Sequence, residues 1–159
     1  MDWSSPDVKL STDACLTGAG GWCGNMFFSC AFPKAVLVKD FHINVLELLT
    51  ILVALRLWGD KFSGSRLQLY CDNDASVVII NSGKTRDKEM LRILREILFI
   101  GATHGFQIRA VHLPGVVNRK ADFLSRAASN PSIRITEVMD SDSVRCEVHD
   151  SDFLVIDHW

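Results

Sequence analysis

Apolar and polar residues are distributed along the chain in a pattern that predicts strands first and helices afterwards. Residues 8–16 form the first expected strand, and the glycine-rich turn 18–21 leads into a second apolar run over 22–32, as in a hairpin. Pro33 ends the second strand because proline cannot donate to a sheet ladder. Residues 35–38 would then supply a short third strand of an antiparallel meander.

The middle of the chain predicts alternating helices and strands. A largely buried helix is expected from its cap Asn44 to about Lys61, because apolar residues cover most of its circumference. The remaining elements are strands over 66–71 and 106–113, and helices over 74–81, 87–104 and from Asn118 to about 128. This order predicts an α/β fold, a five-stranded mixed sheet flanked by helices.

Charge divides the chain into a basic part and an acidic part. Residues 1–136 contain 16 Lys and Arg against 12 Asp and Glu, whereas residues 137–159 contain one Arg and seven acids. A mildly basic globular part is compatible with a polyanionic partner such as nucleic acid. The polar and acidic end has too little apolar surface to offset its ordering entropy. We therefore expect one domain over 1–128 and a flexible acidic tail or linker over 129–159, although the closing FLVIDHW is apolar enough to dock.

Several classes of protein are disfavoured. The longest apolar stretch, residues 45–58, is interrupted by polar residues and is shorter than the roughly 20 residues of a membrane span. The amino terminus has no basic region followed by an apolar run, so secretion is not expected. The five cysteines contain no C-x-x-C pair, which argues against a disulfide framework and a structural zinc site. We expect an intracellular protein with reduced thiols and no membrane partner.

Four acidic residues stand where an ionised side chain is costly. Asp13 interrupts the first strand, and Glu47 lies in the nearly all-apolar helix. Asp72 ends the fourth strand, and Asp122 opens the last helix. A carboxylate in or beside a core costs several kcal/mol unless a counter-ion is present. Oxygen ligands without His or Cys favour hard ions, so the four acids predict Mg²⁺ or Mn²⁺.

Each acid also has an ordinary explanation when it is taken alone. Asp13 could lie at a bulge, Asp72 could cap the following helix, and Asp122 could be favoured by the helix dipole. Glu47 could extend to solvent or pair with an arginine. The occurrence of all four in this order is what favours a shared metal site.

Four short segments resemble the motifs of ribonuclease H domains. They are TDACLTGAGGW around Asp13, INVLELLTILVAL around Glu47, YCDNDASV around Asp72, and VHLPGVVNRKADFLSR, in which His112 precedes Asp122 by ten residues. The closing segment, H-x-P-G followed by N-x-x-A-D-x-L-S-R, is particularly similar to ribonuclease H domains of long-terminal-repeat and tyrosine-recombinase retroelements. The resemblance covers about residues 7–128.

The resemblance implies a ribonuclease H-like fold and an endonuclease that hydrolyses the RNA strand of an RNA/DNA hybrid. Asp13, Glu47, Asp72 and Asp122 would hold two Mg²⁺ or Mn²⁺ ions across the scissile phosphate, one activating water and the other stabilising the leaving 3′ oxygen. His112 matches a mobile histidine that assists proton transfer or product release; alternatively, it is an exposed histidine without a role. The resemblance also implies a reverse transcriptase domain in the same polyprotein, and a place in the cytoplasm, in retroelement particles or in the nucleus.

Five further residues are candidates for substrate binding. Asn44 matches a position that contacts the 2′ hydroxyls that distinguish RNA from DNA, and it is also the expected helix cap. Asn118 matches by its spacing from the last acid, and capping is its favoured role. Lys84, Arg86 and Lys88 would bind phosphates of the DNA strand.

The sequence also departs from the ribonuclease H pattern. Ala14-Cys15 follows the first aspartate where Gly-Ser or Ala-Ser is frequent, and SGKTRDK leaves no room for the basic extra helix of some relatives. Weak hybrid binding by the isolated domain is therefore expected. Two other functions stay open: a catalytically idle ribonuclease H-like structural or interaction module, and a nuclease or integrase acting on DNA. The complete set of acids argues against the first, and Asn44 with the H-x-P-G segment argues against the second.

Overall fold

The computed structural model describes residues 3 and 5–155. Its strands are β1 (Val8–Ala14), β2 (Gly18–Cys23), β3 (Met26–Ala31), β4 (Arg66–Cys71), β5 (Gln107–His112) and β6 (Val144–Arg145). Its α-helices are α1 (Lys34–Leu37), α2 (Ile43–Trp58), α3 (Asp74–Ser82), α4 (Lys88–His104) and α5 (Arg119–Ala127). Three 3-10 turns complete the described elements: η1 (Gly59–Phe62), η2 (Ile135–Glu137) and η3 (Asp150–Phe153).

The strands form one mixed sheet in the order β5-β4-β1-β2-β3-β6. β1, β2 and β3 pair antiparallel in succession, whereas β1 with β4, β4 with β5 and β3 with β6 pair parallel. The predicted α/β fold with a mixed sheet flanked by helices is therefore confirmed. The observed sheet has six strands instead of five, because residues 144–145 of the acidic tail add β6.

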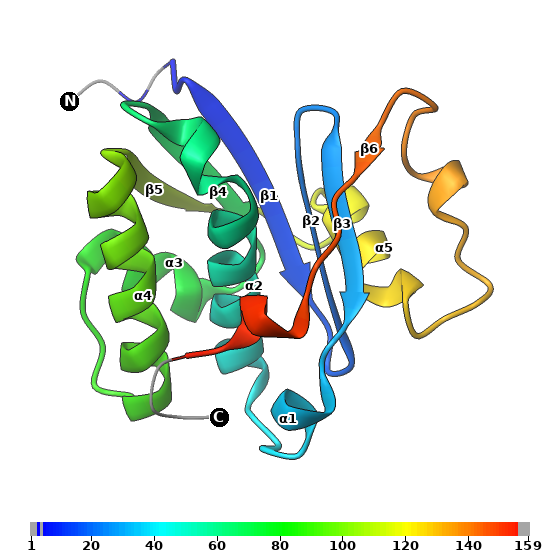
Figure 1. Ribbon diagram of the computed structural model, residues 1–159, viewed down its shortest axis with the longest axis horizontal. Coiled ribbons are helices and arrows are strands. Elements are labelled where there is room, and N and C mark those ends of the chain that lie inside the picture. The colour runs from blue at the N-terminus through cyan, green and yellow to red at the C-terminus, as the bar shows by residue number, and fades with distance from the viewer. Residues whose placement is uncertain (1–2, 4, 156–159) are drawn as a thin grey trace.

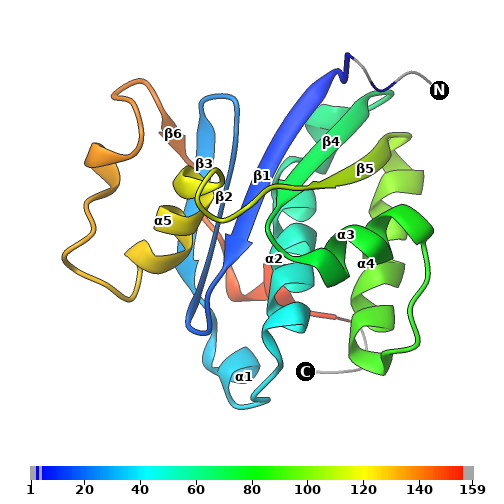
Figure 2. The same ribbon diagram turned by 180° about the vertical axis from the view of Figure 1, so that it is seen from behind.

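Helices cover both faces of the sheet. α2 and α4 pack together on one face, and α5 lies on the opposite face against β1, β2 and β3 (Figures 1 and 2). The main core lies between the sheet and α2, where the rings of Phe28 and Trp58 are 5.6 Å apart. α2 is buried along most of its length, as predicted. No helix among the described residues is long and apolar enough to span a bilayer.

The amino-terminal meander differs from the prediction in register. The predicted glycine-rich turn is β2, and the chain reverses at residues 24–25, where Gly24 adopts a φ of +59°. A Cβ at Gly20 would lie 2.5 Å from the backbone of Leu124 in α5. The glycine in this strand is therefore required by the close approach of the helix. Residues 35–38, predicted as a strand, lie mostly in the single-turn helix α1, which starts after Pro33.

The helix caps also differ in part from the prediction. His42, not Asn44, is the N-cap of α2, and its Nδ1 accepts a hydrogen bond from the backbone amide of Asn44 at 3.0 Å. Asn118 occupies the N-cap position of α5 but makes no side-chain capping bond. α4 follows the prediction closely: Asp87 caps its start, and Gly105 ends it with a φ of +70°.

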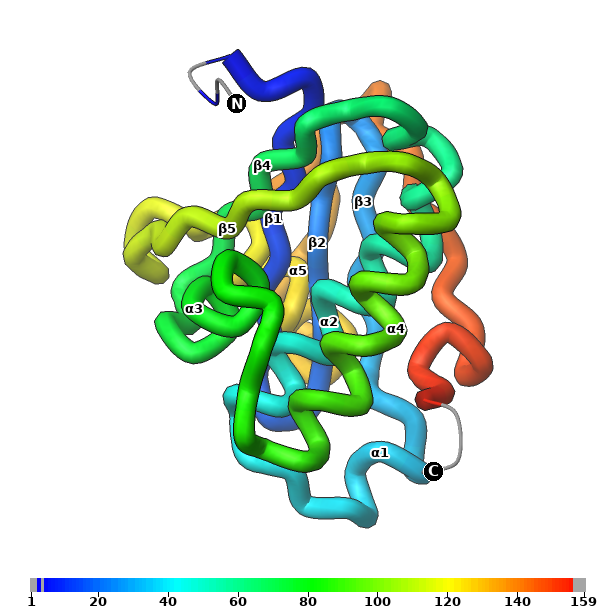
Figure 3. The backbone as a smooth tube through the Cα atoms, turned by 90° about the vertical axis from the view of Figure 1, so that its left-hand side faces the viewer, coloured from blue at the N-terminus to red at the C-terminus, as the bar shows by residue number. Residues whose placement is uncertain are grey.

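The acidic tail, expected to be a flexible linker, contacts the domain at three places: β6 pairs with β3, Met139 packs on Phe27 and Leu124, and η3 contacts α2. Figure 3 shows it descending along one side of the molecule, in orange and red, to η3, which contacts α2. Met139, Phe153 and Val155 are buried, and the rings of Phe153 and Phe32 meet edge to face at 5.8 Å. Apolar side chains spaced among the acids give the tail its buried surface. Residues 156–159, part of the apolar closing segment, lie outside the described residues.

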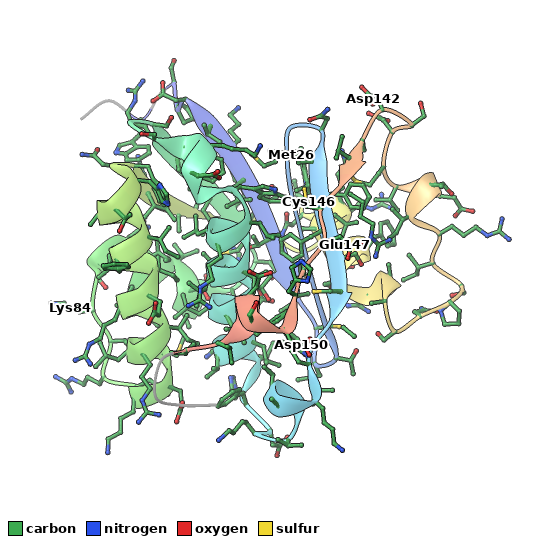
Figure 4. The ribbon with its side chains drawn as sticks, viewed as in Figure 1. Met26, Lys84, Asp142, Cys146, Glu147 and Asp150 are labelled. Carbon is green, nitrogen blue, oxygen red and sulfur yellow. The ribbon has the colours of Figure 1, made fainter. Side chains whose placement is uncertain are left out.

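Hydrogen bonds from α2 fix the last part of this tail. Arg56 donates to the backbone carbonyls of Asp152 and Leu154, and the indole nitrogen of Trp58 donates to Sγ of Cys146 at 3.3 Å. Figure 4 shows Cys146 next to the sheet and Asp150 farther along the tail. The acids therefore lie on a backbone that is held by neighbouring residues.

Candidate metal centre

Three of the four predicted acids meet at one edge of the sheet. β1 and β4 are parallel neighbours, so their carboxyl ends lie side by side. Asp13 is one residue before the end of β1, Asp72 directly follows β4, and Glu47 faces them from α2. One ligand oxygen from each of these side chains lies within 4.8 Å of the other two. The crevice outside the carboxyl ends of strands is where ligands bind in open α/β sheets.

Glu47 is held by one of its oxygens only. Its side chain is on the second turn of α2 and is 3% exposed. Oε1 accepts a hydrogen bond from the backbone amide of Ala14 at 3.2 Å. Oε2 is buried and has no hydrogen-bond partner within the described part of the chain. A buried carboxylate oxygen without a partner is costly, and a bound cation would satisfy it.

Burial and mutual repulsion make Asp13 and Glu47 hard to ionise. The pKa of Asp13 is raised to about 8, first by burial and then by the negative charge of Asp72. Burial likewise raises the pKa of Glu47 to about 9, with the charge of Asp13 as the next cause. Carboxylates in this state take up either protons or a positively charged partner.

The donor set matches a hard divalent cation. Asp13, Glu47 and Asp72 offer carboxylate oxygens, and no cysteine or histidine belongs to the group. Mg²⁺ and Mn²⁺ prefer such oxygen ligands, and Mg²⁺ typically binds one or two carboxylates together with substrate phosphates. The residues present therefore fit the predicted metal.

Asp122 lies beside this cluster. It shares with Asp72 a cleft of about 450 Å³ whose wall also includes Arg119. Its Oδ1 accepts a hydrogen bond from Nε of Arg126, one turn later in α5, at 3.0 Å. The negative charge of Asp122 contributes to the raised pKa of Asp13. Asp122 therefore lies in the same cleft as Asp72, whereas the group whose ligand oxygens meet consists of Asp13, Glu47 and Asp72.

His112 is the last residue of β5 and pairs in register with Cys71, which precedes Asp72. Its Nε2 lies 3.5 Å from Oδ1 of Asp74, and its side chain is 40% exposed. The turn that follows packs directly on the cluster, because a Cβ at Gly115 would lie 3.0 Å from Oδ2 of Asp72. The imidazole is therefore solvent-accessible at the edge of the sheet where the acids lie.

The predicted substrate-binding residues divide into two groups. Asn44 belongs to the first, because its Oδ1 accepts a hydrogen bond at 2.8 Å from Asn73, the residue after Asp72. Asn73 in turn caps α3 by accepting from the amide of Ser76. The two amide side chains thus lie next to the carboxylates.

The basic residues form the second group, farther along the chain. Lys84, Arg86 and Lys88 are exposed, in the connection between α3 and α4 and at the start of α4. Figure 4 shows Lys84 at the outer edge of the molecule. Asn118 belongs to neither group: it is 4% exposed, and its Nδ2 donates to the carbonyl of Thr12 at 3.0 Å. This bond ties the start of α5 to the strand that contains Asp13.

Three residues at the site escaped the sequence interpretation. Arg119 lines the cleft, Arg126 pairs with Asp122, and the hydroxyl of Ser125 lies 2.9 Å from Oδ2 of Asp13. Their spacing on either side of Asp122 places them on neighbouring positions of one helix face. This spacing from Asp122 is the sequence feature that could have identified them.

Solved structures with this arrangement of elements are known. The chain is similar to LC11-RNase H1, an enzyme isolated from compost by a metagenomic approach. Its structure in complex with an RNA/DNA hybrid has a TM-score of 0.64 and 18% identity, covering 80% of this chain and 100% of that one. The chain has the ribonuclease H-like fold. No protein-family model matches the sequence, and a search of curated proteins gives no match.

Two further structures support the same assignment of the ribonuclease H-like fold. RNase H1 from the halophilic archaeon Halobacterium salinarum has a TM-score of 0.61 and 15% identity, covering 77% of this chain and 96% of its own. The N-terminal RNase H domain of a Mycobacterium tuberculosis protein has a TM-score of 0.59 and 15% identity, covering 77% of this chain and 100% of its own. At these identities the likeness shows the fold, and function has to be argued from the site.

Proposed function

We propose that this ribonuclease H-like domain is a divalent-metal-dependent endonuclease that hydrolyses the RNA strand of RNA/DNA hybrids. The observation that supports it most is the group formed by Asp13, Glu47 and Asp72, whose ligand oxygens lie within 4.8 Å of one another. The buried, unpartnered Oε2 of Glu47 indicates that this group is built for a cation. The complex of LC11-RNase H1 with an RNA/DNA hybrid supports the choice of substrate.

Asp13, Glu47 and Asp72 would hold the metal, with Asp122 as a further ligand from α5. Two bound Mg²⁺ or Mn²⁺ ions would supply an activated water and would offset the negative charge on the leaving 3′ oxygen. Ala14 contributes by orienting Glu47 through its backbone amide. An aspartate, a glutamate and a second aspartate on three rigid elements give the metal a preorganised site.

Residues around the carboxylates would bind the substrate and move a proton. The imidazole of His112, exposed at the end of β5, would transfer the proton. Asn44 and its bonded neighbour Asn73 offer amide groups to 2′ hydroxyls of the RNA strand. Lys84, Arg86 and Lys88 offer exposed positive charge to phosphates of the DNA strand.

We further propose that the domain works in a retroelement polyprotein next to a reverse transcriptase domain. The support is the segment VHLPGVVNRKADFLSR, which resembles the closing motif of retroelement ribonuclease H domains. The short connection between α3 and α4, residues 83–87, contains no basic helix, so additional grip on the hybrid would have to come from an adjoining domain.

A cleavage assay on matched substrates tests the proposed activity. A hybrid with labelled RNA, double-stranded RNA and double-stranded DNA of one sequence would be incubated with Mg²⁺, Mn²⁺ or a chelator. We expect metal-dependent cutting of the RNA strand of the hybrid alone, and its loss in Asp72→Asn. Cutting of double-stranded DNA would favour a DNA nuclease, and absence of cutting in every arm would favour an idle module.

A further inference from the structure

The hydroxyl of Ser125 is buried between the side chain of Asp13 and the backbone of Asp122. Its side chain is fully buried on α5. Oγ lies 2.9 Å from Oδ2 of Asp13 on β1 and 2.7 Å from the backbone carbonyl oxygen of Asp122. A hydroxyl has one hydrogen to donate, and both neighbours accept when Asp13 is ionised. Ser125 therefore donates to one of them at a time.

The ionised carboxylate is the stronger acceptor of the two. A hydrogen bond to a charged oxygen is roughly twice as strong as one between neutral groups. When Asp13 is charged, as it is when it binds a cation, the hydrogen of Ser125 is directed to Oδ2 of Asp13 instead of the neutral carbonyl of Asp122. The bond then fixes the rotation of the Asp13 carboxylate.

Tight packing places Ser125 accurately. A Cβ at Gly18 would lie 2.5 Å from the backbone oxygen of Ser125, so α5 rests directly on the backbone of β2. Cys15 donates through Sγ to the same backbone oxygen at 3.3 Å. The helix cannot slide along the sheet without breaking these contacts.

We propose that Ser125 is a positioning residue for metal binding: its hydroxyl orients Asp13 and couples α5, with Asp122, to the strand that contains Asp13. This role rests on the metal site of the proposed function. Hydrogen-bonded partners of metal ligands typically affect metal affinity about 10- to 100-fold when they are removed. An effect of that size on affinity is therefore expected from the hydroxyl of Ser125.

Metal titration of three variants tests the role. Ser125→Ala removes the hydroxyl, Ser125→Thr retains one, and Ser29→Ala is the matched control. Ser29 is also buried and also bonds to the backbone of α5, but within the described part of the chain its side chain makes no hydrogen bond to a carboxylate. Mn²⁺ affinity would be measured by calorimetry without substrate, and thermal unfolding would be followed in chelator.

We expect Ser125→Ala to weaken Mn²⁺ binding about 10- to 100-fold. Ser29→Ala should bind Mn²⁺ like the wild type even where both variants lower the melting temperature. Ser125→Thr, where it folds, should recover most of the lost affinity. Equal Mn²⁺ affinity of Ser125→Ala and wild type would overturn the role, and so would an equal loss in Ser29→Ala. A wild type that binds no Mn²⁺ would instead reject the metal site itself.

Discussion

The backbone amide of Ala14 donates to Oε1 of Glu47 at 3.2 Å, across 33 residues of sequence. This bond joins β1 to α2 at the point where both contribute a carboxylate to the proposed metal centre. It leaves Oε2 of Glu47 buried without a partner among the described residues. The fold therefore presents a preformed oxygen to a cation, at a cost in stability while no cation is bound.

Glu47→Gln should separate stability from activity. Glutamine keeps the shape of the side chain and, unlike Glu47, does not have to take up a proton on folding above about pH 5, so we expect the melting temperature in chelator to rise or stay the same. Hybrid cleavage should fall by at least about 100-fold, because losing a ligand costs more than losing one of its outer partners. Thermal unfolding and a single-turnover cleavage assay measure the two effects. Retained cleavage would exclude Glu47 as a ligand.

The metal-free protein should lose stability as pH rises from 5 to 8. Unfolded carboxyls ionise near pH 4, whereas the pKa values of Asp13 and Glu47 in the fold are raised to about 8 and about 9. Between these limits the folded state retains protons that the unfolded state has lost. Stability then falls with pH, by up to about 1.4 kcal/mol per pH unit for each group.

Denaturant unfolding in chelator at several pH values measures this slope. Asp13→Asn is the control, since it removes one titrating group and relieves the repulsion on the other, so its slope should be shallower. Saturating Mg²⁺ should stabilise the wild type more at pH 8 than at pH 6, because protons compete with the metal. A stability that rises between pH 5 and 8 in chelator would contradict the raised pKa values.

The tail should be part of the folded unit. Phe153 is buried against Phe32, so Phe153→Ala should lower the free energy of unfolding by about 3–5 kcal/mol. Its neighbour Leu154 is 49% exposed, and Leu154→Ala should change stability by less than about 0.5 kcal/mol. Chemical denaturation measures both. Equal stabilities of Phe153→Ala and wild type would show that the tail is a loosely attached linker.

Hybrid binding by this chain alone should be weak and strongly dependent on salt. Replacing Lys84, Arg86 and Lys88 by alanine should reduce affinity and lower the slope of log affinity against log salt by about 0.7 to 0.9 per lost phosphate contact. Lys61→Ala is the control, because Lys61 is exposed in η1, just before the amino end of β4 and away from Asp72. Fluorescence anisotropy in Ca²⁺ would measure binding. A salt slope unchanged in the triple variant would rule out these phosphate contacts.

Long periodic elements and inconvenient charges were the features that sequence could predict. The helix over α4 was expected within one residue of its observed start, because Asp87 and Gly105 are strong local signals. Glu47 is predicted as a candidate ligand because an acid is costly in such an apolar helix and because three other acids occur with it in the order of the motifs. Asp13 and Asp72 lie close together because β1 and β4 are parallel neighbours, whose carboxyl ends meet at one edge of the sheet.

The misplaced elements depend on contacts between distant segments. Gly20 disfavours a strand locally, yet it lies in β2, where the close approach of Leu124 leaves no room for a side chain. The apolar closing segment predicts that Phe153 could dock, but its packing on Phe32, beside α2, is visible only in the folded chain. Ser125 lies 112 residues from Asp13 in sequence, so their hydrogen bond is visible only in the folded chain.

A crystal structure grown with Mn²⁺ tests the metal centre most directly, because the anomalous signal of Mn²⁺ locates the ion without regard to activity. We predict an anomalous peak between Asp13, Glu47 and Asp72, at about 2.0–2.3 Å from their oxygens. Oε2 of Glu47 should be among those ligands. Mn²⁺ bound elsewhere, with the three carboxylates still together and without an ion at saturating metal, would contradict the account.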